Sequence, residues 1–282
     1  MRRESVLCAA PSGLHRLSYT EWGDPRNPRV LVCVHGLTRC ARDFDPVAAA
    51  LADRYRVVCP DMPGRGESDW LKNPMEYATP VYVNAAVTLM ARLGVDEVHW
   101  VGTSMGGLLG MVVASLERTP IRRLVVNEAG PLVSATALER IGTYVGKAPD
   151  FADMDEAERY IRAVSAPFGP HSDAEWRFLT EHVVRAKPDG RLRVHYDPAI
   201  AVPFDAAAPH KDLDLWTFWE QIRCPTLAIR GELSDLLSRE TVERMRTTGP
   251  RASAVEIAGV GPAPTLMQPA LIAIVRDFLL AA

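Results

Sequence analysis

The segment VGTSMGG places a serine between two glycines in a pattern that could supply a nucleophile. Gly102, Ser104 and Gly106 fit the pattern GxSxG, directly after a predicted strand and directly before a helical pattern. Such a tight turn needs neighbours without side chains two positions away on each side, because the backbone is strained and closely packed there. At a helix N-terminus, free backbone amides also favour developing negative charge. We therefore predict that Ser104 is a nucleophile; an ordinary serine in a Gly-rich turn is the alternative.

A second turn, in the stretch VHGLTR, follows another predicted strand and carries His35 and Gly36. We expect the backbone N–H of Leu37 to join that of Met105 in an oxyanion hole, which binds the negative oxygen of a tetrahedral intermediate. His35 and Gly36 are predicted to line the substrate pocket. The His35 ring itself is more typical of a structural histidine that orders the loop.

Short apolar runs rich in β-branched residues alternate with helical patterns, which is typical of parallel strands joined by crossover helices. Strands are predicted at residues 29–36, 55–61, 98–104, 122–130, 225–232 and 253–259. Helices are predicted at residues 44–52, 80–93, 106–118, 239–247 and 269–280. An antiparallel pair at residues 5–7 and 15–22 is expected at the N-terminal edge. The sequence therefore predicts an α/β fold.

One long segment, from residue 131 to residue 216, interrupts this alternation with helical patterns that contain no strand signal. The stretch SDAEWRFLTEHVVRA opens with Ser172 and has Glu175 three residues later, the spacing of a capping box at a helix start. A structureless loop of this length is uncommon in a compact domain. We therefore expect a helical cap at residues 131–216 and a core formed by residues 1–130 and 217–282.

Five motifs, taken in order, resemble those of the α/β-hydrolase fold family over nearly the whole chain. They are HG at 35–36, DMPGRGESD at 61–69, GTSMGG at 102–107, NEAGP at 127–131 and GELSDLL at 231–237. The resemblance implies a mostly parallel eight-stranded sheet, a helical cap, and a Ser, Asp, His triad in that chain order. Asp235 occupies the family's acid position, where a carboxylate orients and stabilises an imidazolium; a helix N-cap is the alternative role. Glu128 is the second candidate acid, because some relatives carry the carboxylate there.

The position of the catalytic base departs from that family pattern. The family's histidine normally stands in a stretch similar to GxGHxP, and GVGPAPTL at 259–266 matches around it with Pro262 in the histidine's place. Proline has no titratable group and no backbone N–H, so it cannot accept the serine proton. A serine hydroxyl without a base is a poor nucleophile at neutral pH. The triad is therefore predicted to be broken, with slow residual turnover at best by the family mechanism.

Three explanations of Pro262 compete. The chain is a substituted form of an active hydrolase, a pseudoenzyme or binding protein that kept the pocket, or an enzyme that recruits a different base. The candidate replacement bases are the histidines of the HG turn and of the expected cap: His35, His171, His182, His195 and His210.

Aromatic residues are concentrated in or next to the expected cap. Trp176, Trp216 and Trp219 are predicted to line the substrate pocket, which suits an apolar or aromatic acyl group; packing of the cap onto the sheet is the alternative. We expect a serine hydrolase acting on a small carboxylic ester, while carbon–carbon bond hydrolases and lyases of this fold also keep the serine. Arg65 and Glu67 are expected to form a salt-bridged turn, and a contact with a charged group of the substrate is the alternative.

Composition argues against several classes of partner. A formal net charge of -3 over 282 residues gives no basic field for nucleic acid or an anionic membrane. No apolar run approaches a membrane span, and the N-terminal run is too short for a signal peptide. Five cysteines show no CxxC pair or metal-ligand spacing. We therefore expect no metal, no organic cofactor, a cytoplasmic location, and a monomer or homodimer.

Overall fold

Eight strands form one sheet in the computed structural model, which describes residues 1–281. Their order is β1-β2-β4-β3-β5-β6-β12-β13. The strands of this sheet are β1 (Arg2–Ala10), β2 (Gly13–Trp22), β3 (Val30–Val34), β4 (Arg56–Pro60), β5 (Val98–Thr103), β6 (Ile121–Asn127), β12 (Thr226–Gly231) and β13 (Ser253–Ile257). The pairs β1–β2 and β2–β4 are antiparallel and the other pairs are parallel. The predicted mostly parallel eight-stranded sheet is confirmed.

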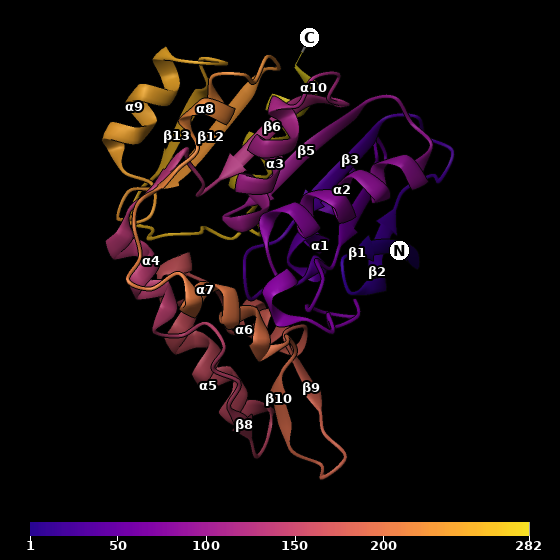
Figure 1. Cartoon of the computed structure of the whole chain (residues 1–282), viewed down its shortest axis with the longest axis vertical. Coiled ribbons are helices and arrows are strands. Elements are labelled where there is room, and N and C mark those ends of the chain that lie inside the picture. The colour runs from indigo at the N-terminus through magenta and orange to yellow at the C-terminus, as the bar shows by residue number, and fades with distance from the viewer. Residues whose placement is uncertain (282) are drawn as a thin grey trace.

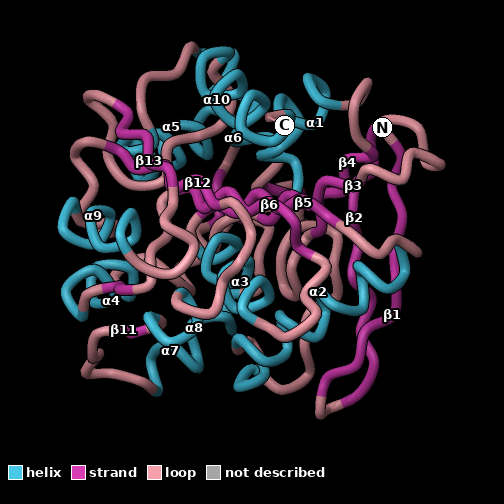
Figure 2. The backbone as a smooth tube through the Cα atoms, turned by 90° about the horizontal axis from the view of Figure 1, so that it is seen from above, coloured by secondary structure: helices cyan, strands magenta, loops and turns pink. Residues whose placement is uncertain are grey.

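Helices cover both faces of this sheet (Figures 1 and 2). One face carries α1 (Asp45–Leu51) and α10 (Pro269–Leu280). The other face carries α2 (Thr79–Leu93), α3 (Met105–Ser115), α8 (Trp216–Trp219) and α9 (Arg239–Thr247). Because both faces are covered, the central strand β3 is apolar throughout, and every one of its residues is buried.

The segment between β6 and α8 lies beyond the carboxyl ends of the parallel strands and forms the narrow lower part of the molecule in Figure 1. Its helices are α4 (Ala135–Gly142), α5 (Met154–Ser165), α6 (Asp173–Glu181) and α7 (Val202–Ala206). The predicted capping box begins α6: the Glu175 N–H donates to Ser172 Oγ at 3.3 Å, and the Ser172 N–H donates to Glu175 Oε2 at 2.7 Å.

The expectation that this segment contains no strand is wrong. Its short strands are β7 (Leu132–Val133), β8 (Asp150–Phe151), β9 (Val184–Ala186), β10 (Leu192–Val194) and β11 (Leu213–Asp214), which form a β8-β10-β9 sheet and a β11-β7 pair. The β9–β10 hairpin turns at Asp189 and Gly190, where Gly190 has φ +83°. An Asp-Gly pair between short strands is a hairpin signal, and it lay inside a pattern otherwise typical of helices.

Single helical turns complete the described chain: η1 (Ala41–Phe44), η2 (Pro74–Glu76), η3 (Ala166–Phe168) and η4 (Pro198–Ala201). Within residues 1–281, none of the helices combines the length and the apolar character that a bilayer crossing requires.

Candidate active site

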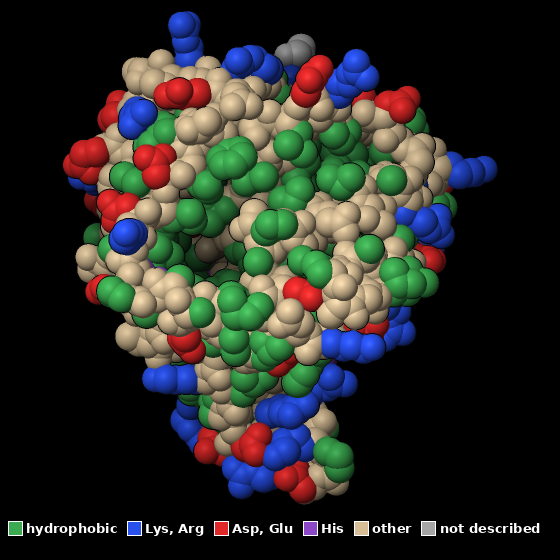
Figure 3. All heavy atoms as spheres, in the orientation of Figure 1, with side chains coloured by type: hydrophobic (Ala, Val, Ile, Leu, Met, Phe, Trp, Pro, Cys, Tyr) green, Lys and Arg blue, Asp and Glu red, His purple; other side chains and the backbone are tan. Residues whose placement is uncertain are grey.

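A cavity of about 760 Å³ lies between the carboxyl ends of the strands and the segment 131–216. Leu37, Ser104 and Glu128, which follow β3, β5 and β6, line it from the sheet side. Leu138 and Phe204 line it from the inserted segment. Figure 3 shows a hollow in the face of the molecule that is turned toward the viewer, with hydrophobic side chains around it. The volume lies within the range of about 300–1,000 Å³ that is typical of small-molecule sites.

Ser104 stands on the strained turn that the GxSxG pattern predicted. It has φ 51° and ψ -116°, directly between the end of β5 and the start of α3. A side chain at Gly106 would clash with the backbone of Val34, and one at Gly102 would clash with the backbone of Gly106. The two glycines are therefore required because β5, α3 and β3 approach one another closely here. Strain of this kind is found preferentially at functional sites.

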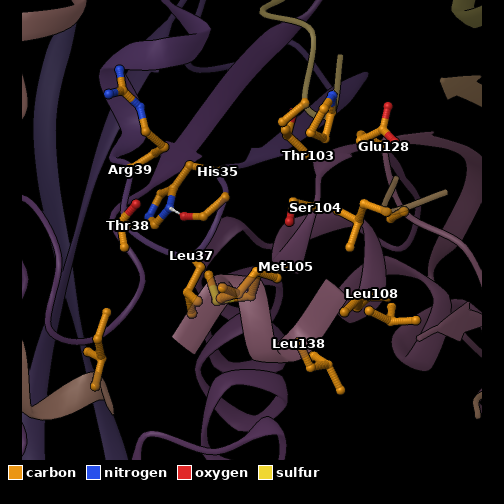
Figure 4. A pocket seen from close by; sticks show the side chains of 18 of the residues that line it. His35, Leu37, Thr38, Arg39, Thr103, Ser104, Met105, Leu108, Glu128 and Leu138 are labelled. Atoms are coloured by element: carbon orange, nitrogen blue, oxygen red, sulfur yellow. Dashed lines mark hydrogen bonds between the residues drawn. The ribbon is translucent and has the colours of Figure 1, made fainter. Parts of the chain in front are cut away.

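The Leu37 amide is oriented by hydrogen bonds to the carbonyl group of the same peptide unit. The Gly36 carbonyl accepts from His35 Nδ1 at 2.7 Å and from the Arg39 N–H at 3.2 Å (Figure 4). In a trans peptide the N–H points away from the C=O, so the Leu37 N–H is directed to the opposite side. The Met105 N–H is the first amide of α3, a position that has no partner within its own helix. Leu37 and Met105 line the same cavity as Ser104, and in Figure 4 their side chains lie next to each other; the oxyanion hole formed by their amides stays a prediction.

The His35 ring is fully occupied by structural contacts. Its Nε2 accepts the Met62 N–H at 2.9 Å while its Nδ1 is bound to the Gly36 carbonyl. Complete burial lowers the pKa of His35 to about 4. With both nitrogens engaged, this ring has no lone pair free for the Ser104 proton, and it orders the loop as expected.

Asn127 holds the loop of Pro262 beside the Ser104 turn. Its carbonyl accepts the Ser104 N–H at 2.8 Å, and its side-chain Nδ2 donates to the Pro264 carbonyl at 2.8 Å. Asn127 is the last residue of β6 and is fully buried. The stretch around Pro262 is therefore fastened to the same residue that fixes the backbone of Ser104. Sequence reasoning missed this role, although the asparagine opens the NEAGP motif.

Pro262 borders two hollows. It lines the cavity that contains Ser104, and it also lines an adjoining groove of about 720 Å³ that contains Asp235. Ser104 is a lining residue of the cavity and Asp235 of the groove. Position 262 therefore borders both hollows, as Arg140 and Pro167 also do.

Asp235 is half-exposed and already has a cationic partner. Its Oδ1 lies 2.9 Å from Arg140 Nη2 and its Oδ2 lies 2.6 Å from Arg140 Nε. Arg140 belongs to α4, so this ion pair joins the inserted segment to the loop after β12. Local sequence patterns contain no sign of the pairing, because the two residues are 95 positions apart.

Glu128 is the buried carboxyl group of the cavity. It follows β6 with φ 54°, and its Oε2 accepts the Gly231 N–H at 2.8 Å. The Ser234 hydroxyl donates to Oε1, and Ser234 Oγ itself accepts the Leu236 N–H at 3.0 Å. Burial raises the pKa of Glu128 to about 7. Glu128 thus organises the loop that carries Asp235, a role that sequence reasoning did not assign.

The four other candidate bases lie in different surroundings. His171 Nδ1 is bound to the Gly169 carbonyl at 2.8 Å, and its Nε2 lies 2.6 Å from the Thr265 hydroxyl. His182 packs edge-on against Phe178, and burial lowers the pKa of His195 to about 4. The His210 ring packs at a tilt against Phe204, and His210 and His35 are the two histidines among the residues that line the cavity.

The three tryptophans predicted to line the pocket pack elsewhere. Trp176 contacts the His171 ring, and the Trp219 Nε1–H donates to the Thr248 carbonyl at 3.2 Å. The Arg244 guanidinium lies 3.8 Å from the centre of the Trp216 ring. None of the three is a lining residue of the cavity, so the packing alternative describes them better. Aliphatic and tyrosine side chains replace them in the wall: Leu108, Val112, Leu138, Ile141, Tyr144, Tyr160 and Ile161.

The expectation of a salt-bridged turn at Arg65 and Glu67 is wrong. The Arg65 guanidinium donates to the carbonyls of Leu37 and Pro63 and to the Tyr82 hydroxyl. Glu67 contributes its backbone N–H to Asp61 Oδ2 at 3.0 Å. The arginine is drawn inward because carbonyl oxygens satisfy its donors in the protein interior.

Polar side chains that line the cavity from the sheet side include Thr103, Ser104 and Glu128. No group of three or more His, Cys, Asp or Glu side chains in residues 1–281 is arranged to hold a metal ion.

Comparison with known proteins adds independent information. The family model described as alpha/beta hydrolase fold matches residues 29–246. A 3-hydroxybutyrate-oligomer hydrolase from Cupriavidus necator is 49% identical over 280 residues, which cover 97% of this chain and 96% of that protein. A crystal structure of a protein from Rickettsia typhi has a TM-score of 0.93 and 33% identity, with 99% of each chain covered. An alpha/beta hydrolase from Novosphingobium aromaticivorans has a TM-score of 0.86 and 36% identity, with 98% of each chain covered.

Proposed function

The chain belongs to the α/β-hydrolase fold family, and from this premise we propose that it is a serine ester hydrolase whose base position is filled by Pro262. The observation that carries the proposal is the placement of Ser104 on a strained turn in the wall of an apolar cavity, next to the first residue of α3, Met105, and in the same wall as Leu37. This arrangement is what attack on an ester carbonyl requires.

The proposed mechanism begins with attack of Ser104 Oγ on the carbonyl carbon. The developing oxyanion accepts hydrogen bonds from the Leu37 and Met105 amides. In a complete triad, an imidazole at position 262 takes the serine proton, and Asp235 stabilises the imidazolium. With Pro262, no group at that position takes the proton, and it passes to solvent water. Collapse of the tetrahedral intermediate breaks the C–O bond to the alcohol, which takes a proton from water, and a second water then hydrolyses the acyl-serine. An oxyanion hole and substrate binding alone give a rate of about 10³ to 10⁴ over water, so we expect slow turnover.

The proposed substrate is a short linear ester of a hydroxy acid, such as an oligomer of 3-hydroxybutyrate. The similarity to the Cupriavidus necator enzyme supports this class. The cavity supports it as well, since its wall is mainly aliphatic and its volume exceeds that of a single acetyl group.

The test compares four proteins on 3-hydroxybutyrate dimers and trimers and on short p-nitrophenyl esters. They are the chain itself, Pro262→His, Ser104→Ala, and the double variant that carries both Pro262→His and Ser104→Ala. General base catalysis contributes about 10²–10⁴-fold, so we expect Pro262→His to raise kcat by that order. The double variant should lose the gain. Equal rates in Pro262→His and in the double variant would contradict the proposal, because the added base would then not act through Ser104.

A ligand-binding protein on the same scaffold is the second candidate. The observation that favours it is the ion pair of Asp235 with Arg140, which occupies the carboxylate that a triad would use. Calorimetric titration of the chain with the 3-hydroxybutyrate trimer separates the two. Tight binding without product formation, together with an inert Pro262→His variant, would establish the binding function.

A further inference from the structure

Arg65 is a fully buried cation behind the wall of the cavity. It lies in the loop after β4, and its side chain has no exposed surface. Its Nη1 donates to the Pro63 carbonyl at 2.7 Å and to the Tyr82 hydroxyl at 2.7 Å. Burial of a charge is costly unless the surroundings replace its hydration, so a buried arginine at this place calls for a functional explanation.

The two remaining side-chain hydrogen bonds of Arg65 go to Leu37 and Met105, the two residues of the proposed oxyanion hole. Its Nε–H donates to the Leu37 carbonyl at 2.8 Å, and its Nη2 lies 3.8 Å from Met105 Sδ. We infer that Arg65 is a positioning residue that holds Leu37 and Met105 together and adds positive potential where the oxyanion forms. This inference rests on the proposed ester hydrolysis.

The backbone contact explains the positioning role. The Gly36 carbonyl is fixed by His35 and Arg39 on one side of Leu37, and Arg65 fixes the Leu37 carbonyl on the other. Both peptide units that flank the Leu37 Cα are therefore held, which leaves its N–H with one direction. An amide that needs no reorientation during the reaction stabilises a transition state better than a mobile one.

The charge of Arg65 is not cancelled by a carboxylate. Its guanidinium lies 5.1 Å from the centre of the Tyr82 ring and 5.9 Å from that of Tyr77, and in the described part of the chain it forms no ion pair. The Asp197 carboxylate nearby accepts the Tyr77 hydroxyl at 2.5 Å instead. A cation held by ring faces and carbonyls in the protein interior keeps its field for a transient anion.

The experiment is carried out in the Pro262→His background, with Arg65→Met and Arg65→Lys as test variants. Arg56→Met is the matched control, because Arg56 is also largely buried and donates to a backbone carbonyl, that of Leu93, away from the cavity. Each protein is assayed on an oxygen ester and on the corresponding thionoester, whose developing sulfur anion accepts weaker hydrogen bonds from the hole.

We expect Arg65→Met to lower kcat on the oxygen ester about tenfold or more with little change in KM, since one oxyanion donor is worth about 10²–10³ in kcat. The thionoester rate should fall less, and Arg65→Lys should recover part of the loss because it keeps the charge. Arg56→Met should leave the ratio of the two rates unchanged. The same ratio in Arg65→Met, Arg65→Lys and the parent would overturn the inference while the proposed hydrolysis stands.

If the Pro262→His parent is inactive, the proposed function has failed. A second measurement then still tests the role of Arg65. Hydrogen exchange of the unmodified chain is compared with that of Arg65→Met, Arg65→Lys and Arg56→Met. We expect faster exchange in the Arg65 variants only, at the hydrogen-bonded amides of Arg39 and Gly107, which donate to the Gly36 and Ser104 carbonyls beside Leu37 and Met105. Unchanged exchange at these amides in both Arg65 variants would overturn the positioning role.

Discussion

Asp235 and Arg140 form a two-contact ion pair that joins the loop after β12 to the first long helix of the inserted segment. The carboxylate proposed as the acid of the triad is therefore held by a guanidinium in this chain. An imidazole introduced at position 262 would compete with Arg140 for the same two oxygens.

Removing that competitor is expected to increase activity in the variant that carries a histidine. Arg140→Gln in the Pro262→His background should raise kcat several-fold, because Asp235 then stabilises the imidazolium alone. Both partners are substantially exposed, so the loss of the ion pair should cost less than about 1 kcal/mol in the free energy of unfolding. Esterase kinetics and urea denaturation measure the two effects. A fall in kcat would show that Arg140 supports the acid instead of competing for it.

The close approach at Gly106 predicts a severe effect of a single methyl group. Gly106→Ala would place its Cβ against the backbone of Val34, which cannot move without displacing β3. We expect loss of soluble protein or several kcal/mol of destabilisation, measured by thermal unfolding. Gly94→Ala is the control, since Gly94 has φ 68° but open space around it. It should cost only about 1 kcal/mol. Equal effects would mean that the close approach of the Val34 backbone does not explain the glycine at 106, which has no positive φ.

The raised pKa of Glu128 predicts a pH-dependent stability. Its pKa is about 7 in the folded state against an ordinary value of 4.5. Between these values the folded state keeps a proton that the unfolded state has lost, so this contribution is full below pH 4.5 and declines as pH rises through 7. A pKa that differs by one between the two states changes the free energy of unfolding by about 1.4 kcal/mol.

Urea denaturation of the chain and of Glu128→Gln from pH 4.5 to 7.5 measures this contribution. The stability difference should move steadily in favour of the glutamine variant as pH increases. The exposed Glu139 provides the control, and the difference for Glu139→Gln should stay flat. A flat difference for Glu128→Gln as well would show that its carboxyl group titrates normally.

Replacement of the missing base by another histidine is expected not to occur. His171 already accepts from Thr265 at Nε2, and burial lowers its pKa. The His210 ring packs at a tilt against Phe204, within the inserted segment. Residual hydrolysis by the unmodified chain should therefore change less than about twofold, within ordinary assay scatter, in His171→Gln and His210→Gln. Active-site labelling with an organophosphonate is measured in parallel. A tenfold loss in either variant would identify that histidine as the base.

Local signals predicted much of the fold. The last two helices are found at the predicted bounds, Arg239–Thr247 and Pro269–Leu280. Ser238 begins the first of these as an N-cap, and Pro269 occupies the first turn of the second, where its missing N–H costs nothing. The Ser104 turn could also be predicted, because its strain and close packing require glycine two positions before and two positions after the serine.

Interactions between distant positions could not be read in this way. Arg65 donates to Leu37, 28 positions away, and nothing in the motif PGRGES distinguishes that contact from a surface ion pair. The packing of the three tryptophans could not be predicted either. Their spacing indicates a buried helix face, but it does not distinguish a face that meets a cavity from one that meets another helix. The hairpin of β9 and β10 was hidden because its strands are only three residues long.

Pro262 borders both the cavity of Ser104 and the groove of Asp235, and the chain keeps both the serine and the aspartate. Some proline codons differ from a histidine codon in a single base. A single nucleotide change is therefore enough to place an imidazole at position 262, on the border of both hollows. On the proposed mechanism, one base separates a slow ester hydrolase from one with a complete triad.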